Sequence, residues 1–386
     1  MSRLNLLMLN YEFPPIGGGA ANAHYYLLKE YADINELKVD VLTSAPEPGF
    51  LKETFSENIT IYRVGVHKKQ LHYWRRIEVI EWLLKAGFHY RRMLRRRSFN
   101  LVHAFFGFPT GWLCYRTAGR LPYIISLRGS DVPGQHARLA VDYKLLGPLF
   151  KAIWTKASAL VACSEGLKSR ALRFLPSAAI DIIPNGVDLE RFFPSETTKL
   201  SDELRLITVG RLSVTKRIEV LIDAVEILIQ QGYKVRFSII GGGVAEQSLR
   251  KLIIEKNLVS FVELTGRVEP EKMPDFYRGS DIYISATMQE GMSNAMLEAM
   301  ASGLPVITTR CEGAEELIVE NGIVVEQAGA EPMAGAIKQL ADDRKRCERM
   351  AVKARKQAEL FTWKNVAGKY LDCYRKILSV AVGSKS

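Results

Sequence analysis

The sequence predicts an α/β protein built from two Rossmann-like, doubly wound domains that face a central cleft. Short apolar runs alternate with amphipathic helical patterns, and this alternation occurs twice along the chain. Continuous apolar runs of this length are typical of buried parallel strands, and helices between such strands cover both faces of a sheet. A chain of 386 residues is also too long for one typical hydrophobic core.

The first domain is expected to span residues 1–190. A glycine-rich turn follows its first strand, and the pattern after the turn predicts a helix at 20–32. We expect its buried strands at residues 4–11, 38–44, 101–107, 123–129 and 159–164. His103 stands at the end of one such strand and is interpreted as a packed residue rather than a catalytic one.

The second domain is expected to span residues 191–360, after a polar linker at 184–203. Its helices are predicted at 218–231 and 245–257. We expect its strands at residues 204–210, 234–243, 261–266, 282–287 and 304–309. A last amphipathic helix is predicted at about 361–380.

Composition excludes several classes of protein. The five cysteines are widely spaced and include no CxxC pair, so neither a zinc site nor a disulfide framework is indicated. No apolar run approaches the roughly 18–20 residues that a membrane span needs. The N-terminal stretch is interpreted as a strand rather than a signal peptide. A reducing cytoplasm is therefore the expected location.

Two glutamates flank a predicted short helix in the stretch EGMSNAMLEAMASGLPVITT, residues 290–309. Ser293 or Asn294 is the expected N-cap, and Gly303 suits the position just after the helix. Free backbone N–H groups near this helix start form an anion site. Glu290 precedes the helix and Glu298 lies one turn inside it, where its carboxylate could accept from a sugar diol. A solvated helix face remains the alternative.

Two cations follow a strand-end glycine in GRLSVTKRIE. Gly210 is followed by Arg211 and, five residues later, by Lys216. Two cations at this place could clamp a diphosphate through charge-assisted hydrogen bonds, which contribute roughly 1.5–3 kcal/mol each. Surface charge at a helix start is the alternative interpretation.

These motifs, taken in order, resemble those of the family-4 (GT4) glycosyltransferases with the GT-B fold. The resemblance runs from FPPIGGGAANAHYYLL at residue 13 to FTWKNVAGKYL near the C-terminus, and CSEGLKSRA and IPNGVDLERF lie between. It implies a retaining transferase that binds a nucleotide-diphosphate sugar, with UDP or GDP as the expected nucleotide, mostly through its C-terminal domain. It also implies that the last helix packs back on the N-terminal domain.

The resemblance implies a role for each site residue. Arg211 and Lys216 hold the diphosphate and offset the charge on the leaving group, and Glu290 contacts the transferred sugar. Glu298 binds the ribose hydroxyls. The backbone amides of Met292, Ser293 and Asn294 contact the distal phosphate. Arg267 and Val268 lie at the base. Gly18 and Gly19 approach the phosphates. As an alternative, the glycines only form a permissive turn.

One position departs from the family pattern. Many relatives have His-Gly-x-Asp where this chain has Arg128, Gly129, Ser130 and Asp131. Arginine is permanently charged and cannot act as a base. Arg128 could instead contact an acidic sugar, an acceptor phosphate or the diphosphate, and Asp131 is carried over as a substrate-binding residue.

No metal and no other cofactor is expected, since the sequence contains no Asp-x-Asp and the cations can supply the electrostatic stabilisation. A front-face displacement is the expected mechanism, and a covalent intermediate on Glu290 is the alternative.

Basic residues are concentrated at 68–97, which holds ten Lys/Arg and two Glu, a net charge of +8 in a chain of +11. Apolar residues recur there near helical spacing, with Trp74 and Trp82 alongside them. They are Tyr73, Ile77, Ile80, Leu84, Phe88 and Leu94. A basic amphipathic helix of this kind indicates an anionic membrane surface and a lipid-linked or surface-glycan acceptor. Packing of the apolar stripe on the first domain is the alternative, and no nucleic-acid motif accompanies the charge.

Two rival functions remain at this level. A nicotinamide-dependent oxidoreductase would use the glycines of SIIGGGVAE, but Glu246 stands where the third glycine of that fingerprint belongs. A catalytically silent nucleotide-sugar-binding or membrane-associated scaffold of the same fold is the second rival.

Overall fold

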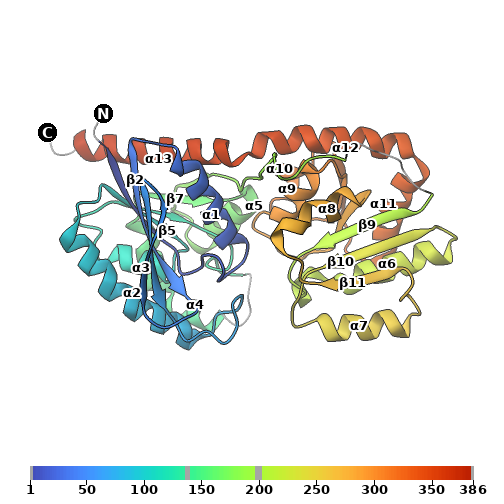
Figure 1. The fold of residues 1–386 in the computed structure, drawn as a ribbon, viewed down its shortest axis with the longest axis horizontal. Helices are drawn as coiled ribbons and strands as arrows, with labels where there is room; N and C mark the ends of the chain where they lie inside the picture. Colours follow the sequence, from blue (N-terminus) through green and yellow to red (C-terminus); the bar gives the residue numbers. More distant parts are fainter. Residues whose placement is uncertain (1–2, 135–139, 196–201, 384–386) are drawn as a thin grey trace. The chain divides into compact units, whose positions relative to one another are not determined.

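The computed structural model describes residues 3–134, 140–195 and 202–383. The chain divides into two compact units, Met1–Asn185 with Trp363–Ser386, and Gly186–Thr362. Each unit is an α/β layer structure with its own sheet, as the sequence predicts (Figure 1). The division at residue 185 falls inside the predicted linker, of which residues 196–201 lie outside the described residues.

The first unit is built on an eight-stranded sheet in the order β3-β4-β2-β1-β5-β6-β7-β8. All neighbouring strands are parallel except β3 and β4, which form an antiparallel pair at one edge. The strands are β1 (Leu4–Leu9), β2 (Leu37–Ala45), β3 (Phe50–Ser56), β4 (Ile59–Gly65), β5 (Leu101–Phe105), β6 (Tyr123–Ser126), β7 (Ala159–Ala162) and β8 (Ile180–Ile182). The chain reverses its direction of strand addition between β1 and β5, so these two strands flank the switch point of the sheet.

In the part of the first unit that the structure describes, six α-helices accompany this sheet. They are α1 (Gly19–Ala32), α2 (Arg76–Arg96), α3 (Thr110–Tyr115), α4 (Ala140–Thr155), α5 (Glu165–Phe174) and α13 (Trp363–Gly383). The C-terminal helix α13 packs on α1, where the rings of Trp363 and Tyr26 stack with centroids 5.5 Å apart. The hydroxyl of Tyr31 on α1 donates to that of Tyr374 on α13 at 3.1 Å.

The second unit is built on a six-stranded parallel sheet in the order β11-β10-β9-β12-β13-β14. Its strands are β9 (Leu204–Val209), β10 (Val235–Ile240), β11 (Val262–Gly266), β12 (Ile282–Ser285), β13 (Val306–Thr309) and β14 (Gly322–Val325). Numbered from its first strand, this order is 3-2-1-4-5-6, the order of dinucleotide-binding sheets. The switch point therefore lies between β9 and β12.

The helices of the second unit pack their apolar sides on this sheet. They are α6 (Ile218–Gln230), α7 (Glu246–Glu255), α8 (Met273–Arg278), α9 (Asn294–Ala301), α10 (Ala314–Leu317), α11 (Ala330–Asp342) and α12 (Arg344–Ala358), with the 3-10 turn η2 (Val214–Lys216) before α6. On α6, Leu221, Val225 and Leu228 recur at helical spacing and are fully buried in the core. The strands keep their register because both faces of the sheet are covered in this way.

Among the described residues, no helix is both long enough and apolar enough to cross a bilayer.

Candidate functional site

Most of the residues predicted to bind the donor lie at one edge of the second sheet. Arg211 follows β9, Arg267 follows β11, and Glu290 follows β12. The carboxyl ends of parallel strands meet at the same edge, and β11, β10, β9 and β12 are consecutive in this sheet. The fold thus brings together residues that are up to 87 positions apart in the sequence, between Arg211 and Glu298.

Lys216 and Glu290 form an ion pair across the switch point, Nζ to Oε2. Their side chains are about one-fifth exposed, 20% and 22%, so solvent still reaches both groups. The loops after β9 and β12 are joined by a backbone hydrogen bond, in which the N–H of Met288 donates to the carbonyl of Thr215 at 2.9 Å. The side-chain hydroxyl of Thr309, at the end of β13, also donates to the carbonyl of Thr287 at 2.8 Å. The loops that carry Lys216 and Glu290 are therefore held in place by hydrogen bonds.

Arg211 is exposed and makes no ion pair with any described residue. The residue before it, Gly210, has φ of +156°, and a Cβ at Gly210 would lie 3.6 Å from Cε of Lys216. Lys216 therefore lies directly against the backbone of the strand-end glycine. An available guanidinium and a partly paired ammonium lie on the same short loop, which is a suitable arrangement for an anion.

The glycines of SIIGGGVAE have a packing role. A Cβ at Gly241 would lie 1.9 Å from the carbonyl oxygen of Gly210, and one at Gly243 would lie 2.2 Å from that of Leu212. These glycines let the loops after β9 and β10 touch through their backbones. Their presence is explained without the dinucleotide fingerprint of the oxidoreductase alternative.

Glu298 lies on α9 and is only partly exposed. Burial raises the pKa of its carboxyl to about 7, against the hydrogen bond from Tyr277 and the positive charge of Arg191, which both lower it. The Tyr277 hydroxyl donates to Oε2 at 2.9 Å. Near neutral pH this carboxyl is therefore poised between its two protonation states, and hydroxyl donors from a ligand would favour the ionised one.

The start of α9 agrees with the capping pattern expected from the sequence. Ser293 is the N-cap, and its hydroxyl accepts from the N–H of Met296 at 3.3 Å. Gly303 follows the helix with φ of +75°, the left-handed conformation expected at this position. Met292 and Ser293 are buried and Asn294 is partly exposed, so the helix start is set into the loop rather than projecting from it.

Arg267 and Val268 follow β11 on the turn after Gly266, which has φ of +77°. Arg267 is exposed, and its side chain folds over Gly242, where a Cβ would lie 3.1 Å from Nε. Val268 is partly exposed. This turn adjoins the loop after β10, and the N–H of Gly241 donates to the carbonyl of Gly266 at 2.8 Å.

In the first unit, the buried side chain of Asp131 holds the loop around Arg128 by hydrogen bonds. Its two carboxylate oxygens accept from the backbone N–H groups of Gly107 at 2.7 Å and Arg128 at 2.8 Å. Burial raises the pKa of this carboxyl, although the backbone hydrogen bonds lower it in part. With both oxygens engaged, Asp131 acts on the loop around Arg128, and a contact of its own with substrate stays a prediction.

Arg128 lies at the carboxyl edge of the first sheet, after β6, and is partly exposed. One terminal nitrogen donates to Oδ1 of Asn185 at 2.8 Å, and the guanidinium lies 5.6 Å from the ring centre of Phe105. Buried Arg170 holds the loop that follows, since it donates to the carbonyl of Val132 at 2.8 Å. Arg128 is thus a positioned cation rather than a mobile surface arginine.

In the glycine-rich turn after β1, Gly17 is the residue whose backbone conformation requires glycine. This residue has φ of +104°, and a Cβ there would lie 2.7 Å from Cβ of Glu12. Gly18 is the N-cap of α1 with φ of −146°, and Gly19 is the first helical residue. The steric need for glycine therefore falls one position before the two glycines predicted to approach the phosphates.

A buried polar network at the same edge of the first sheet was not predicted from the sequence. His103 contacts Tyr374 through Nδ1 and Ser126 through Nε2, each at 2.7 Å, and Ser126 contacts Tyr370 at 2.8 Å. Burial, and to a smaller extent the positive charge of Arg128, hold the pKa of His103 well below its usual range. His103 is therefore a neutral packed residue, as expected. The tyrosines come from α13, about 250 positions away in sequence, and local patterns carry no signal for such a contact.

His24 extends this neutral region. It is buried, and its ring stacks on Phe105 with centroids 4.4 Å apart. Burial, and then the charge of Arg128, lower its pKa to about 3. Nδ1 lies 3.3 Å from the Asn10 amide nitrogen, whereas Nε2 has no partner among the described residues.

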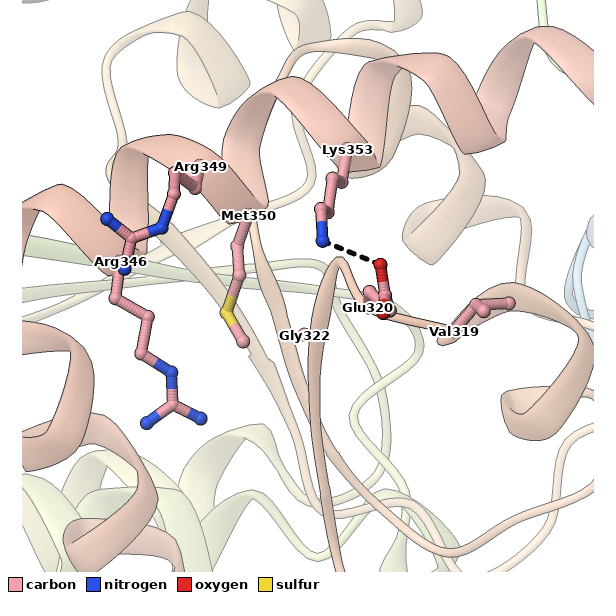
Figure 2. A pocket seen from close by; sticks show the side chains of 7 residues that line it. All are labelled: Val319, Glu320, Gly322, Arg346, Arg349, Met350 and Lys353. Atoms are coloured by element: carbon pink, nitrogen blue, oxygen red, sulfur yellow. Dashed lines mark hydrogen bonds and ion pairs between the residues drawn. The ribbon is translucent and has the colours of Figure 1, made fainter.

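A pocket of the second unit lies at the other edge of its sheet (Figure 2). Gly322, which lines it, is the first residue of β14, so the pocket is at the amino-terminal edge. Its basic side chains have partners: Lys353 pairs with Glu320 at 2.6 Å, and Arg346 donates to Gln339 at 3.1 Å. This pocket contains none of the predicted site residues.

Within the described part of the chain, no group of three or more His, Cys, Asp or Glu side chains is arranged to hold a metal ion.

Two glycosyltransferase family profiles match the chain and together cover nearly all of it. The family described as Glycosyltransferase Family 4 matches residues 17–191, and the family described as Glycosyl transferases group 1 matches residues 190–357. The chain is a GT4-type glycosyltransferase. The resemblance inferred from the ordered motifs is thereby confirmed, and the oxidoreductase alternative is wrong.

Curated relatives agree with this family. An uncharacterized glycosyltransferase of Methanocaldococcus jannaschii is 24% identical over 93% of this chain and 95% of its own. A GDP-mannose-dependent alpha-(1-6)-phosphatidylinositol monomannoside mannosyltransferase of Mycobacterium tuberculosis is 28% identical over 53% of this chain and 58% of its own. A putative teichuronic acid biosynthesis glycosyltransferase of Bacillus subtilis is 29% identical over 62% of this chain and 60% of its own.

Solved structures show that the transferase has the GT-B fold. Sucrose-phosphate synthase of Thermosynechococcus elongatus matches with a TM-score of 0.84 at 21% identity, covering 98% of this chain and 100% of that one. HepE of Anabaena, solved in complex with UDP and glucose, matches with a TM-score of 0.74 at 18% identity, covering 97% and 100%.

Proposed function

We propose that this glycosyltransferase moves a sugar from a UDP- or GDP-sugar to a lipid-linked or surface-glycan acceptor, with retention of anomeric configuration and without a resident metal. The observation that carries the proposal is the group of charges at the switch point of the second sheet. Arg211 and Lys216 offer two cations on the loop after β9, and Glu290 stands across from them. In open α/β sheets this is the place where ligands bind.

The charges suit the two ends of a nucleotide-diphosphate sugar. An ammonium has three N–H donors, so Lys216 can keep Glu290 and still donate to a phosphate oxygen. Arg211 can add a bidentate contact to the same diphosphate. Glu298, held by Tyr277, would accept from the ribose hydroxyls. Backbone amides around Met292 would meet the distal phosphate at the start of α9.

The proposed reaction is a front-face displacement. The bond between the anomeric carbon and the diphosphate oxygen breaks, and its electron pair leaves with the phosphate. The acceptor hydroxyl forms the new bond on the same face, and its proton passes to the leaving phosphate oxygen. Arg211 and Lys216 stabilise the negative charge as it develops, which is the largest contribution expected from fixed cations in a partly desolvated site.

The ion pair of Lys216 with Glu290 disfavours the alternative mechanism, in which Glu290 forms a covalent intermediate. Attack by the Glu290 carboxylate would require it to leave an ion pair that the loops after β9 and β12 hold in place. The front-face route leaves the pair intact and needs no nucleophile from the protein. Arg128 takes no part as a base, since a guanidinium does not give up its proton.

The first unit is proposed to hold the acceptor. The names of the mycobacterial and Bacillus relatives, which refer to phosphatidylinositol monomannoside and teichuronic acid, favour an acceptor that is lipid-linked or part of a surface glycan. Such an acceptor would place the enzyme in the cytoplasm, peripherally on the cytoplasmic face of the membrane, with the basic segment 68–97 against an anionic surface.

A thermal-shift panel of UDP, GDP, ADP and NAD tests the donor site. A ligand at 100 times its dissociation constant stabilises the folded protein by about 2.7 kcal/mol. We expect one diphosphate to raise the melting temperature of the wild type and to have little effect on Lys216→Ala. Lys251→Ala is the matched control, since Lys251 is 78% exposed on α7 and pairs with Glu255 in the next turn. Equal stabilisation of all three proteins would show that the diphosphate binds elsewhere.

A further inference from the structure

Helix α2 has two separate apolar faces, and only one of them is packed. The packed face turns to the rest of the first unit and comprises Trp82, Ala86, Tyr90 and Met93. The second face is in solvent. Its four large apolar side chains have exposed fractions of 68% for Ile77, 54% for Ile80, 71% for Leu84 and 63% for Phe88. The two tryptophans expected beside this stripe, Trp74 and Trp82, are buried instead.

These exposures decide between the two interpretations of the stripe. If the stripe existed to pack α2 on the first unit, its members would be covered, but the packing is done by the opposite face. Single exposed apolar residues are ordinary, whereas a contiguous row over three helical turns is typical of an interaction site. The apolar stripe of α2 is therefore not explained by packing on the first unit and is a candidate interaction surface.

The same face continues as arginine toward the end of the helix. Ile77, Ile80, Leu84, Phe88, Arg91 and Arg95 follow one another at intervals of three or four residues, the spacing of a single helix face. Arg91 and Arg95 are exposed, and so are their neighbours Arg92 and Arg96. The surface is thus apolar over its first turns and cationic over its last ones.

The two acids of the helix do not offset this charge. Glu78 is buried, and Lys68 at 2.8 Å and Arg75 at 2.7 Å neutralise it. Glu81 accepts from Lys85 at 2.6 Å. Burial alone would raise the pKa of Glu81, but the hydrogen bonds from Lys85 and His67 lower it overall.

Helix α4 widens the surface at its apolar end. Arg76 at the start of α2 pairs with Asp142 at the start of α4 at 3.0 Å. Beside that pair, α4 exposes Val141 at 60% and Leu145 at 73%. The ion pair therefore joins two exposed apolar stretches from helices that are about 65 residues apart in the sequence.

We propose that the exposed face of α2, together with Val141 and Leu145 of α4, is a docking face for an anionic lipid bilayer. This inference rests on the proposed lipid-linked acceptor and deepens it by naming the surface. Apolar side chains would enter the acyl boundary while the arginines meet anionic headgroups. A second copy of the chain fits less well, because this face offers no unpaired acid to match its own arginines.

The docking face is fixed to the glycine-rich turn of the first unit. The N–H of Gly17 donates to the carbonyl of Leu71 at 3.0 Å, and His72 bonds to the carbonyl of Gly17 through Nδ1. The segment that makes these contacts runs directly into α2, where buried Lys68 and Glu78 anchor it. A bilayer bound at α2 would therefore hold this turn in a fixed place relative to the membrane.

Co-sedimentation with vesicles tests the proposal without donor or acceptor. Wild-type protein should sediment with phosphatidylglycerol vesicles at low salt, less so at high salt, and little with phosphatidylcholine vesicles. Leu84→Glu should lower the partition into phosphatidylglycerol vesicles by about tenfold or more, because it places a charge in the apolar stripe. Arg95→Glu should lower it with a weaker salt dependence than that of the wild type.

The C-terminal helix offers matched controls in the same unit. Val380 on α13 is 68% exposed, and Arg375 on α13 is also exposed, while α13 lies apart from α2 (Figure 1). Val380→Glu and Arg375→Glu make the same chemical changes and should leave vesicle binding close to the wild type's. Circular dichroism of each variant checks that the fold is kept.

Three results would overturn the proposal. The first is no binding of the wild type to phosphatidylglycerol vesicles at low salt. The second is equal binding by Leu84→Glu and Val380→Glu. The third is a wild-type dimer that Leu84→Glu dissociates while vesicles are not bound, which would assign the face to a second copy. Lys216→Ala should bind vesicles like the wild type, so failure of the donor site and failure of the docking face give different results.

Discussion

The carboxyl edges of the two sheets have the same architecture and opposite chemistry. In the second unit, the switch point between β9 and β12 holds an ion pair, Lys216 with Glu290. Beside it lies the exposed guanidinium of Arg211, which pairs with no acid among the described residues. In the first unit, the switch point between β1 and β5 is filled with neutral groups, because burial keeps the pKa of His103 and of His24 far below neutrality. Charged side chains lie on the loops around these neutral groups: Glu12 follows β1, and Arg128 and Asp131 follow β6.

This difference indicates a division of labour within one fold. Charged side chains that are partly exposed and held on loops joined by hydrogen bonds can form new ion pairs with a charged ligand. Buried neutral groups form no ion pair with a ligand, but their hydrogen bonds make this edge of the sheet rigid. The contrast agrees with the proposal that the second edge binds the diphosphate and that the first holds the acceptor.

The largest effect is expected from Lys216→Ala. Loss of one preorganised cation at the developing charge should lower kcat/KM by about 100- to 1,000-fold. Steady-state kinetics with the donor identified by the thermal-shift panel measures this, and Lys251→Ala should match the wild type. A kcat/KM for Lys216→Ala equal to that of the control would remove Lys216 from the reaction and break the proposed contrast between the two edges.

Glu298→Gln should weaken nucleotide binding without destabilising the folded protein. The variant keeps an acceptor for Tyr277 but loses a charge-assisted contact to the ribose, so nucleotide affinity should fall by about tenfold. Isothermal titration calorimetry at two pH values tests the cause. The ligand's terminal phosphate titrates at about pH 6 for both proteins. Wild-type affinity should nevertheless rise more steeply between pH 5.5 and 8 than that of the variant, because the Glu298 carboxyl also ionises in that range. A pH dependence equally steep in both proteins would assign it to another group.

The same substitution should stabilise the free protein at high pH. Folding raises the pKa of this carboxyl from 4.5 to about 7, so the folded state binds the proton more tightly than the unfolded state does. The stabilisation by the proton is complete below pH 4.5 and is lost as the pH rises through 7. Above pH 7, Glu298→Gln should therefore be more stable than the wild type by on the order of 1–2 kcal/mol, allowing for partial exposure. Urea unfolding at pH 5 and pH 8 measures the difference.

Tyr374→Phe should affect only the first unit. It removes the hydroxyl that joins His103 and Tyr31, and it leaves two buried polar groups without that partner. The expected cost is about 1–3 kcal/mol of unfolding free energy, with nucleotide affinity unchanged. Tyr25→Phe is the control, since Tyr25 is 37% exposed. Weaker nucleotide binding by Tyr374→Phe would show that the neutral network is coupled to the donor site.

The sequence predicts the buried parallel strands well and the edges of the sheets poorly. β9 and β10 are found where apolar runs predict them, because both faces of these strands are covered. The edge pair β3 and β4 was missed, since β3 is exposed over most of its length and reads as FLKETFS. The edge strand β14, GIVV, is too short to be distinguished from a loop.

The grouping of the proposed donor-site residues could be predicted because they lie next to local signals: a strand end, a glycine and a capped helix. Sequence alone did not show the ion pair between Lys216 and Glu290, which depends on the neighbouring positions of β9 and β12 in the sheet. It also did not reveal the role of Asp131, which depends on two backbone amides. The exposure of Ile77 and Leu84 was likewise undecided, because either apolar face of α2 could have been the packed one.

The smallest effects come from two matched glycines, and they address whether the two units unfold separately. Gly335 lies inside α11 of the second unit and Gly368 inside α13 of the first, and a Cβ at either would meet nothing within 4 Å. Replacement by alanine should stabilise each helix by about 0.5–1 kcal/mol. Differential scanning calorimetry with and without the bound nucleotide is the measurement. If the units unfold separately, Gly335→Ala and the nucleotide should raise one transition and Gly368→Ala the other. If all three raise the same transition, the two units are coupled through the fold, and stabilising the first unit also stabilises the second.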